Sequence, residues 1–308
     1  MGAGTDRATQ RGNDLKIAVF TKNRTNPAYA AARLGAARVA QRFGAQTVDF
    51  VPATPDDPEE QGRLIDQALA QRPDAFVIAP VHPTRVNAAL RRIEAARIPV
   101  CAFVNPAQAV KCVTFAGSDD YALGAAVAAH LYRHLGGRGT VLVLAGSAES
   151  PTGVPRVRAF QDVARGFPGI RLAGPLTAAF QREPARELTA RWIEREAPFD
   201  AILAANDVMA LGALDAVREA GHSAVASGVN AIPEAIAAIR DGAMLATADF
   251  DAMTLCALAT ECAIRHVRGE RVPERIELPV QLVERANCSR WDLPFEQRPI
   301  RTLEEVTA

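Results

Sequence analysis

The chain has 308 residues, of which 49% are hydrophobic and 23% charged, and a chain of this length suits two hydrophobic cores better than one. Lys plus Arg and Asp plus Glu each total 35, so the formal net charge is zero and gives no sign of the basic surface that nucleic-acid binding favours. No apolar run reaches the length of about 18 residues that a membrane-spanning helix needs, and the polar stretch 1–14 lacks the apolar segment of a secretory signal peptide.

Short apolar runs alternate with helical stretches from residue 15 onward. In the first series, strands are expected at 15–20, 47–51, 75–79, 99–104 and 113–116, and helices at 27–43, 59–71 and 84–96. The helix 27–43 carries clear end signals, with Asn26 as N-cap, Pro27 in the first turn and Gly44 at its end.

A second series of the same kind follows. Strands are expected at 140–145, 170–176, 201–205, 224–229, 245–248 and 280–283, and helices at 121–135, 154–164, 184–196, 207–220, 232–241 and 252–268. Apolar strands that alternate with helices are typical of βαβ units, whose parallel sheets are buried on both faces. We therefore predict an α/β protein with two doubly wound, Rossmann-like lobes.

Amide and carboxylate side chains recur just after the predicted strands, where open parallel sheets bind their ligands. The clearest of these strand-end residues are Asn26, Asn105, Asn206, Asn230 and Asp249. Such side chains can form hydrogen bonds to adjacent hydroxyl groups. A structural explanation is also open, because Asn26, Asp120 and Asp207 each precede a helix and would serve as caps. Phenylalanines such as Phe180 and Phe250 more often belong to a core, and a lone arginine on a helix, such as Arg156, is usually solvated.

The cysteines and histidines form no recognisable reactive site. The five cysteines are Cys101, Cys112, Cys256, Cys262 and Cys288, and their spacing fits neither a disulfide framework nor a zinc site. We expect them to be small buried side chains, with a Cys101–Cys112 bridge left open. His130 and His134 lie four apart on a predicted helix without a metal-binding motif, so no metal is expected.

Several motifs, in this order and spacing, resemble the type I periplasmic binding proteins for sugars, whose fold also forms the effector domain of lac-repressor-type regulators. The motifs are Asn26-Pro27, Ile98-Pro99-Val100, Ser118-Asp119-Asp120 before Leu123-Gly124, the stretch Asn-Asp-Val-Met-Ala-Leu-Gly from Asn206, and Pro233-Glu234-Ala235-Ile236 before Asp241-Gly242. The resemblance implies two lobes joined by three crossovers near Ser118, 249–251 and 283–285. The expected lobes are 15–118 plus 251–283 and 119–250 plus 284–308, with 1–14 as a disordered tail.

The resemblance also implies which residues contact a ligand. They are Thr21, Asn26, Tyr29, Asn105, Arg156, Phe180, Asn206, Asn230, Asp249 and Phe250. Two departures from the ribose-type pattern stand out, because Val104-Asn105 replaces an Asp-Arg pair and Asn230 replaces an Asp. The loss of these charged groups removes charge-assisted hydrogen bonds. A polyol, deoxy sugar, lactone-like or other small neutral ligand is therefore favoured over ribose itself.

The expected function is that of a periplasmic solute-binding protein, monomeric, that closes on a sugar or polyol and delivers it to an ABC transporter permease. One alternative is the effector domain of a lac-repressor-type regulator, although the 14 residues before the first strand are too few for a helix-turn-helix module. A chemoreceptor sensor is a further alternative that the sequence does not separate from transport. No nucleotide-binding, P-loop or nucleophile-elbow motif is present, so neither catalysis nor a cofactor is expected.

Overall fold

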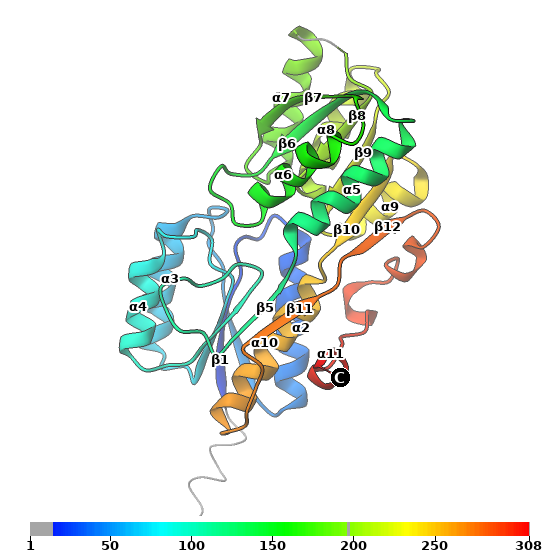
Figure 1. Ribbon diagram of the computed structural model, residues 1–308. Coiled ribbons are helices and arrows are strands. Elements are labelled where there is room, and N and C mark those ends of the chain that lie inside the picture. Colours follow the sequence, from blue (N-terminus) through cyan, green and yellow to red (C-terminus); the bar gives the residue numbers. More distant parts are fainter. Residues whose placement is uncertain (1–14, 196–197, 308) are drawn as a thin grey trace, which may run out of the picture. The chain divides into compact units, whose positions relative to one another are not determined.

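The computed structural model describes residues 15–195 and 198–307, which form two compact units (Figure 1). Unit 1 contains the described residues up to Gly117, the segment Ala252–Leu278 and the residues from Pro299 onward. Unit 2 contains Ser118–Asp251 and Pro279–Arg298. The expected disordered tail, 1–14, lies outside the described residues. Within the described part, no helix is long and apolar enough to cross a membrane.

Unit 1 is built on a six-stranded sheet with the order β11-β5-β4-β3-β1-β2. Its strands are β1 (Lys16–Phe20), β2 (Gln46–Phe50), β3 (Ala75–Ile78), β4 (Val100–Phe103), β5 (Thr114–Ser118) and β11 (Arg275–Leu278). Its helices are α2 (Pro27–Arg42), α3 (Pro58–Ala70), α4 (Asn87–Ala95), α10 (Ala252–Val267) and α11 (Leu303–Thr307). Strands β1 to β5 pair in parallel, so their carboxyl ends share one edge of the sheet.

Aromatic stacking and close helix contact hold unit 1 together. The Phe20 ring stacks on Phe50 at 4.8 Å and on Phe76 at 5.6 Å between ring centroids. Helices α3 and α4 lie on one face of the sheet, and α2 packs against α10 on the other (Figure 1). A side chain at Gly35 of α2 would overlap the Met253 carbonyl oxygen of α10, so glycine is needed for this contact.

Unit 2 has a second six-stranded sheet with the order β12-β10-β9-β8-β6-β7. Its strands are β6 (Arg138–Ala145), β7 (Gly169–Thr177), β8 (Ala201–Ala204), β9 (Val225–Val229), β10 (Met244–Asp249) and β12 (Gln281–Glu284). Its helices are α5 (Asp120–His134), α6 (Gly153–Ala164), α7 (Arg182–Arg195), α8 (Asp207–Glu219) and α9 (Pro233–Asp241), with short 3-10 turns η2 (Cys288–Arg290) and η3 (Phe295–Gln297). The strands pair in parallel except β12, which runs antiparallel to β10.

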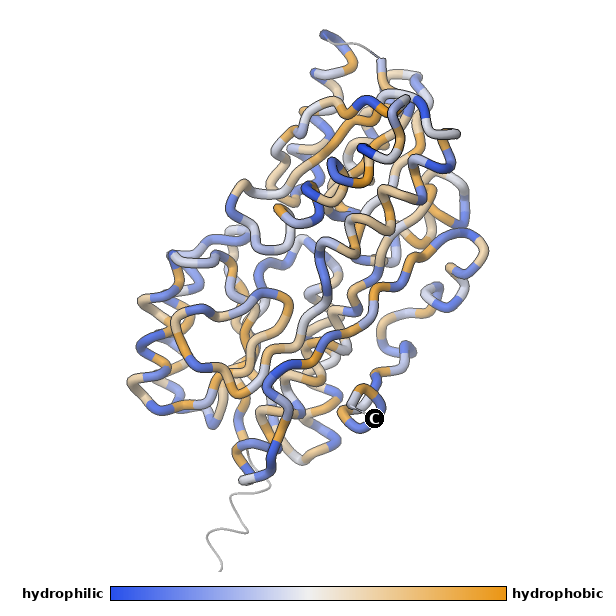
Figure 2. Tube along the Cα trace, viewed as in Figure 1, coloured by the Kyte–Doolittle hydropathy of each residue, from blue (hydrophilic) through white to orange (hydrophobic). Residues whose placement is uncertain are grey.

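The prediction of two doubly wound α/β lobes is confirmed. Central strands such as β3, β4 and β8 are buried along their whole length, as parallel sheets covered on both faces require. Figure 2 shows hydrophobic residues along the strands of each unit and hydrophilic residues at loops and helix ends. Asn26 caps α2 as expected, since its side-chain oxygen accepts a hydrogen bond from the Ala28 amide.

The C-terminal region differs from the expected domain boundaries. Strand β12 pairs with β10, so the segment around 280–283 belongs to unit 2 and not to the first lobe. Residues from Pro299 return to unit 1, where Leu303 is buried and Glu304 forms a 2.8 Å ion pair with Arg265. The chain therefore passes between the units four times, after Gly117, Asp251, Leu278 and Arg298, where three crossovers were expected. Strand β11 and helix α11 were not expected either.

All five cysteines are free, which closes the question of a Cys101–Cys112 bridge. Four of them are buried and Cys112 is half-buried. Burial raises the pKa of the Cys256 and Cys262 thiols, so these groups stay neutral and behave as small packing side chains.

Candidate functional site

The expected ligand residues of unit 1 lie beyond the carboxyl ends of its parallel strands. Thr21 directly follows β1, Asn26 and Tyr29 begin α2, and Asn105 follows β4. All four side chains are buried. Because β1 and β4 flank β3 in the sheet, the topology places these residues at one edge.

The loop after β1 is held by a chain of amide hydrogen bonds. Asn23 accepts a bond from the Asn26 backbone amide at 3.0 Å, and its own side-chain amide donates to Asp56 at 3.2 Å. The oxygen of Asn26 is engaged as the helix cap, whereas its Nδ2 group has no partner among the residues that the structure describes. Capping and ligand binding are therefore compatible roles for Asn26, with the amide nitrogen as the available donor.

Thr21 and Lys22 are already engaged inside unit 1. The Thr21 hydroxyl accepts a 2.7 Å hydrogen bond from Arg33 of α2. Lys22 is buried, and its ammonium group lies 3.9 Å from the Asp56 carboxylate. Sequence reasoning missed Lys22 and Asn23 as buried polar groups, although their position directly after a buried strand was a usable signal.

Asn105 offers an unpaired acceptor. Its Nδ2 donates to the Pro80 carbonyl at 2.7 Å, while its Oδ1 is buried and has no hydrogen-bond partner among the described residues. The preceding Val104 has a φ of 62°, so the chain turns sharply at the end of β4. A buried acceptor without a partner costs about 1–3 kcal/mol, which a donor from a ligand would offset.

Arg156 of α6 is a buried cation of unit 2 with several partners. Its Nε donates to Asp120 Oδ1 at 2.8 Å, and its Nη1 donates to the Ala205 carbonyl at 2.8 Å. The guanidinium also lies over the Phe250 ring, 5.6 Å from the ring centroid. Arg156 is buried, so the interpretation as a solvated helix residue is wrong. The structure thus brings Arg156 and Phe250, two of the expected ligand residues, into contact.

Phe180 and Asn206 are joined by a hydrogen bond. The Asn206 amide donates to the Phe180 carbonyl at 3.3 Å, and its oxygen caps α8 by accepting from Met209 at 2.9 Å. The Phe180 ring occupies space that side chains at Gly146 or Gly153 would fill. These two glycines therefore leave the space that the Phe180 ring needs, a role that the sequence alone did not reveal.

Asn230 directly follows β9 and has an unusual backbone conformation. Its φ is 132°, in the region that favours glycine, and its Oδ1 is buried without a partner among the described residues. Asp207 supports this turn, because its carboxylate accepts bonds from the Ile232 amide at 3.1 Å and from the Thr247 hydroxyl at 2.7 Å. Burial raises the pKa of Asp207 to about 7, although these hydrogen bonds and the charge of Arg156 lower it.

Asp249 is engaged by the C-terminal segment. Its Oδ2 accepts a 2.7 Å bond from the Trp291 indole, and its Oδ1 accepts from the Asp251 amide at 2.7 Å. Burial, and then the charge of Asp251, raise the pKa of Asp249 to about 7. Trp291 was not expected at this position, since it lies 42 residues along the chain from Asp249.

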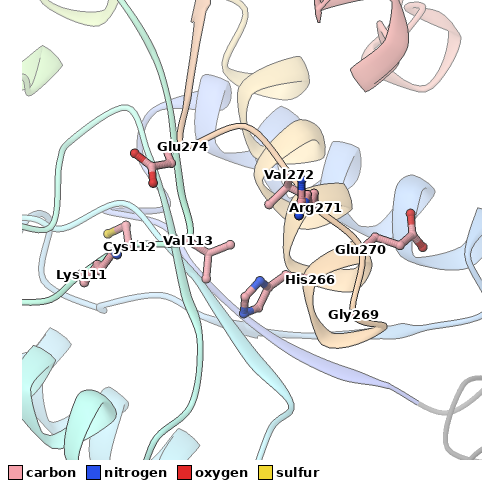
Figure 3. A pocket seen from close by; sticks show the side chains of 9 residues that line it. All are labelled: Lys111, Cys112, Val113, His266, Gly269, Glu270, Arg271, Val272 and Glu274. Atoms are coloured by element: carbon pink, nitrogen blue, oxygen red, sulfur yellow. The ribbon is translucent and has the colours of Figure 1, made fainter.

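Two open hollows of the described surface lie away from these residues. One hollow of about 560 Å³ in unit 1 is lined by residues such as Lys111, Val113 and His266 (Figure 3). Val113 precedes β5, so this hollow is at the amino ends of the strands, opposite the edge that carries Thr21 and Asn105. Across the described residues, no cluster of His, Cys, Asp or Glu is arranged to hold a metal ion.

The family model and the curated relatives that match this chain point to the same protein family. Residues 17–271 match the family described as the periplasmic binding protein domain. The ribose import binding protein of Bacillus subtilis is 26% identical over 273 residues, which cover 87% of this chain and 86% of that protein.

Solved structures show the same relationship. A periplasmic solute-binding protein of an ABC transporter from Actinobacillus succinogenes, with bound D-allose, superposes with a TM-score of 0.83, 25% identity and coverage of 89% and 99% of the two chains. The Caulobacter myo-inositol binding protein gives a TM-score of 0.82 at 25% identity, with coverage of 89% and 95%. The chain therefore belongs to the periplasmic binding protein family, and its two α/β units have the fold of the type I members of that family.

Proposed function

We propose that this chain binds a small, neutral polyhydroxy compound, a sugar or polyol, as the solute-binding component of an ABC importer. The observation that carries the proposal is a pair of buried amide oxygens, Asn105 Oδ1 and Asn230 Oδ1, with no hydrogen-bond partner in the described chain. Each follows a strand at the edge where open parallel sheets bind ligands. Such acceptors call for O–H or N–H donors, which hydroxyl groups supply.

Donors are available among the same expected ligand residues. A guanidinium has five N–H groups, and the contacts of Arg156 with Asp120 and Ala205 leave at least two of them without a partner in the described part of the chain. The Asn26 Nδ2 group is a further donor. A hydroxyl group both donates and accepts, so a polyhydroxy ligand matches this mixture better than a purely accepting or purely donating one.

The charges of these residues are already balanced within each unit. Arg156 is paired with Asp120, and Lys22 with Asp56. Burial in turn raises the pKa of Asp249, which favours its neutral form. A charged ligand would meet no unpaired opposite charge here, and burying it would be costly. This balance supports the expectation of a neutral ligand.

The relatives support the same class of ligand and the same role. Their names describe binding of ribose, D-allose and myo-inositol, and two of them describe import or an ABC transporter. These names favour transport over the alternatives of a regulator's effector domain or a chemoreceptor sensor. A periplasmic location and an ABC permease as partner follow from the same role. Monomeric state and closure of the lobes stay predictions, and small-angle scattering with and without ligand would test both.

Ligand screening tests the proposal directly. A ligand that binds only the folded chain raises the melting temperature, so we expect shifts with some of D-ribose, D-allose, xylitol and myo-inositol. Isothermal calorimetry should then give Asn206→Ala and Arg156→Ala affinities weaker by about tenfold or more, equivalent to about 1.4 kcal/mol.

A matched control comes from Thr189 of α7, whose hydroxyl is also buried without a partner among the described residues but does not follow a strand. Thr189→Val should leave the affinity unchanged. If no neutral sugar or polyol shifts the melting temperature, or if both ligand-residue variants bind like the wild type, the proposal is wrong.

A further inference from the structure

Helix α5 packs closely against α6, and the contact is made between Gly124 and the backbone of Arg156. A Cβ atom at Gly124 would lie 2.6 Å from the Arg156 carbonyl oxygen and 2.8 Å from its Cα, so only glycine permits this contact. Asp120 and Gly124 are four residues apart on α5 and therefore share one face of the helix. The same face that admits the α6 backbone thus presents a carboxylate to the Arg156 side chain.

The carboxylate of Asp120 occupies one edge of the guanidinium. Its Oδ1 lies 2.8 Å from Nε and 2.7 Å from Nη2 of Arg156. The pair is shielded from solvent, with 4% of the Arg156 side chain and 15% of the Asp120 side chain exposed. The Ala205 carbonyl also accepts a hydrogen bond from Nη1, and the Phe250 ring lies under the guanidinium.

The Nε–Nη2 edge of an arginine is one of the forks with which this residue binds carboxylates through two parallel hydrogen bonds. In this chain Asp120 lies against that edge. One N–H group on Nη1 and one on Nη2 have no partner in the described chain and stay available for ligand oxygens. An incoming carboxylate would also lie near the negative charge of Asp120 in a poorly solvated environment, where like charges repel strongly.

We propose that Asp120 determines the charge class of the ligand: it positions the Arg156 guanidinium, occupies one of its carboxylate-binding edges and places a poorly solvated negative charge beside it, so that the protein accepts neutral polyols and sugars and rejects the corresponding sugar acids. The inference rests on the proposed function, because it requires Arg156 to contact the ligand. Asp120 itself is a positioning residue, and its effect on the ligand passes through Arg156.

Asp120→Asn is the direct test, and the adjacent Asp119 supplies a matched control. Asp119 is exposed and caps α5 by accepting from the Ala122 amide at 3.0 Å. Asp119→Asn removes the same unit of charge but retains an amide that can cap the helix. Asp120→Glu is a third variant, which keeps the charge and can restore part of the pairing.

Calorimetry with D-ribose and xylitol as neutral probes, and D-ribonate and D-gluconate as anionic probes, gives the ratio of neutral to anionic affinity. We expect Asp120→Asn to lower this ratio by about tenfold or more, a change of about 1.4 kcal/mol in relative binding. Asp119→Asn should leave the ratio unchanged, and Asp120→Glu should lie closer to the wild type. An unchanged ratio in Asp120→Asn, even with weaker binding of every probe, would overturn the inference and leave Asp120 with a purely structural role.

A measurement on the ligand-free protein tests the inference even if Asp120→Asn binds none of the probes. The Nε–H group of Arg156 should give a slowly exchanging side-chain NMR signal in the wild type, assigned by its absence in Arg156→Lys. That signal should exchange rapidly in Asp120→Asn and stay slow in Asp119→Asn. Equal protection in all the variants that retain Arg156 would contradict the positioning role. If the wild type binds no neutral probe at all, the proposed function fails first and the inference falls with it.

Discussion

Replacing Asn230 by glycine should make the empty protein more stable and the ligand complex weaker. In the ligand-free chain, the buried Oδ1 of Asn230 has no partner among the described residues, and its φ of 132° is one that glycine adopts without strain. The same side chain is expected to accept a hydrogen bond from the ligand. Asn230→Gly removes the unpaired acceptor, the backbone strain and the ligand contact together.

The size of the stability change follows from these contributions. The unpaired acceptor costs about 1–3 kcal/mol, and a strained backbone position costs a similar amount. The greater freedom of glycine in the unfolded chain offsets about 0.5–1 kcal/mol of the gain. A net stabilisation of about 1–5 kcal/mol is expected, and each kcal/mol raises the melting temperature by roughly 2–4 °C for a unit of this size.

Calorimetric scanning of the ligand-free variant and titration with the best neutral probe measure the two effects separately. We expect a higher melting temperature and an affinity weaker by about tenfold or more. Thr247→Val, which loses the hydroxyl that donates to Asp207, is a comparison variant that should lower both stability and affinity. If Asn230→Gly is less stable than the wild type while its affinity is unchanged, Asn230 is a structural residue and the assignment fails.

Three further changes test other parts of unit 2. Gly146→Ala should weaken ligand binding by about tenfold with a smaller loss of stability, because the new methyl group must displace the Phe180 ring; calorimetry checks this. The pKa of Asp207 is raised from 3.8 to about 7, so its contribution to the free energy of unfolding is full below about pH 4 and is lost as the pH rises through 7. In denaturant unfolding between pH 5 and 8, the free energy of unfolding of the wild type should therefore fall by at most about 1.4 kcal/mol per pH unit, and Asp207→Asn should abolish this dependence. Trp291→Phe should lower the free energy of unfolding by about 1–3 kcal/mol in urea titrations, since it leaves the buried Asp249 oxygen without its donor.

The sequence predicts the architecture well because the signals for it are local. The alternation of apolar runs and helices depends on neighbours within one element, and it places β1, β4, β8 and β9 within a residue or two of their observed ends. The Asn26 cap is equally local, since donor and acceptor are two residues apart. Strand-end positions then follow from the topology of a parallel sheet, which is how Asn105 and Asn230 could be selected.

The missed features depend on pairs that are distant along the chain. Trp291 donates to Asp249 across 42 residues, and Arg156 meets Asp120 across 36. No pattern within one element specifies such partners. The return of the C-terminal segment to unit 1 has the same origin, because Glu304 joins Arg265 across 39 residues. The expectation of three crossovers came from the resemblance, and the return of the residues from Pro299 to unit 1 adds the fourth.

An unpaired buried polar group does not by itself identify a binding site. Thr189 in α7 and Ser227 within β9 have unpaired hydroxyls in the described chain, yet each lies inside an element and not beyond its end. Asn105 and Asn230 differ because their acceptors follow the carboxyl ends of parallel strands and sit in backbone turns with positive φ at Val104 or at Asn230 itself. A chain that keeps strained turns and unpaired acceptors at the ligand edge of each sheet gives up stability that ligand binding can restore. The coincidence of these features, more than any one of them, is what supports the proposal of a hydroxyl-bearing ligand.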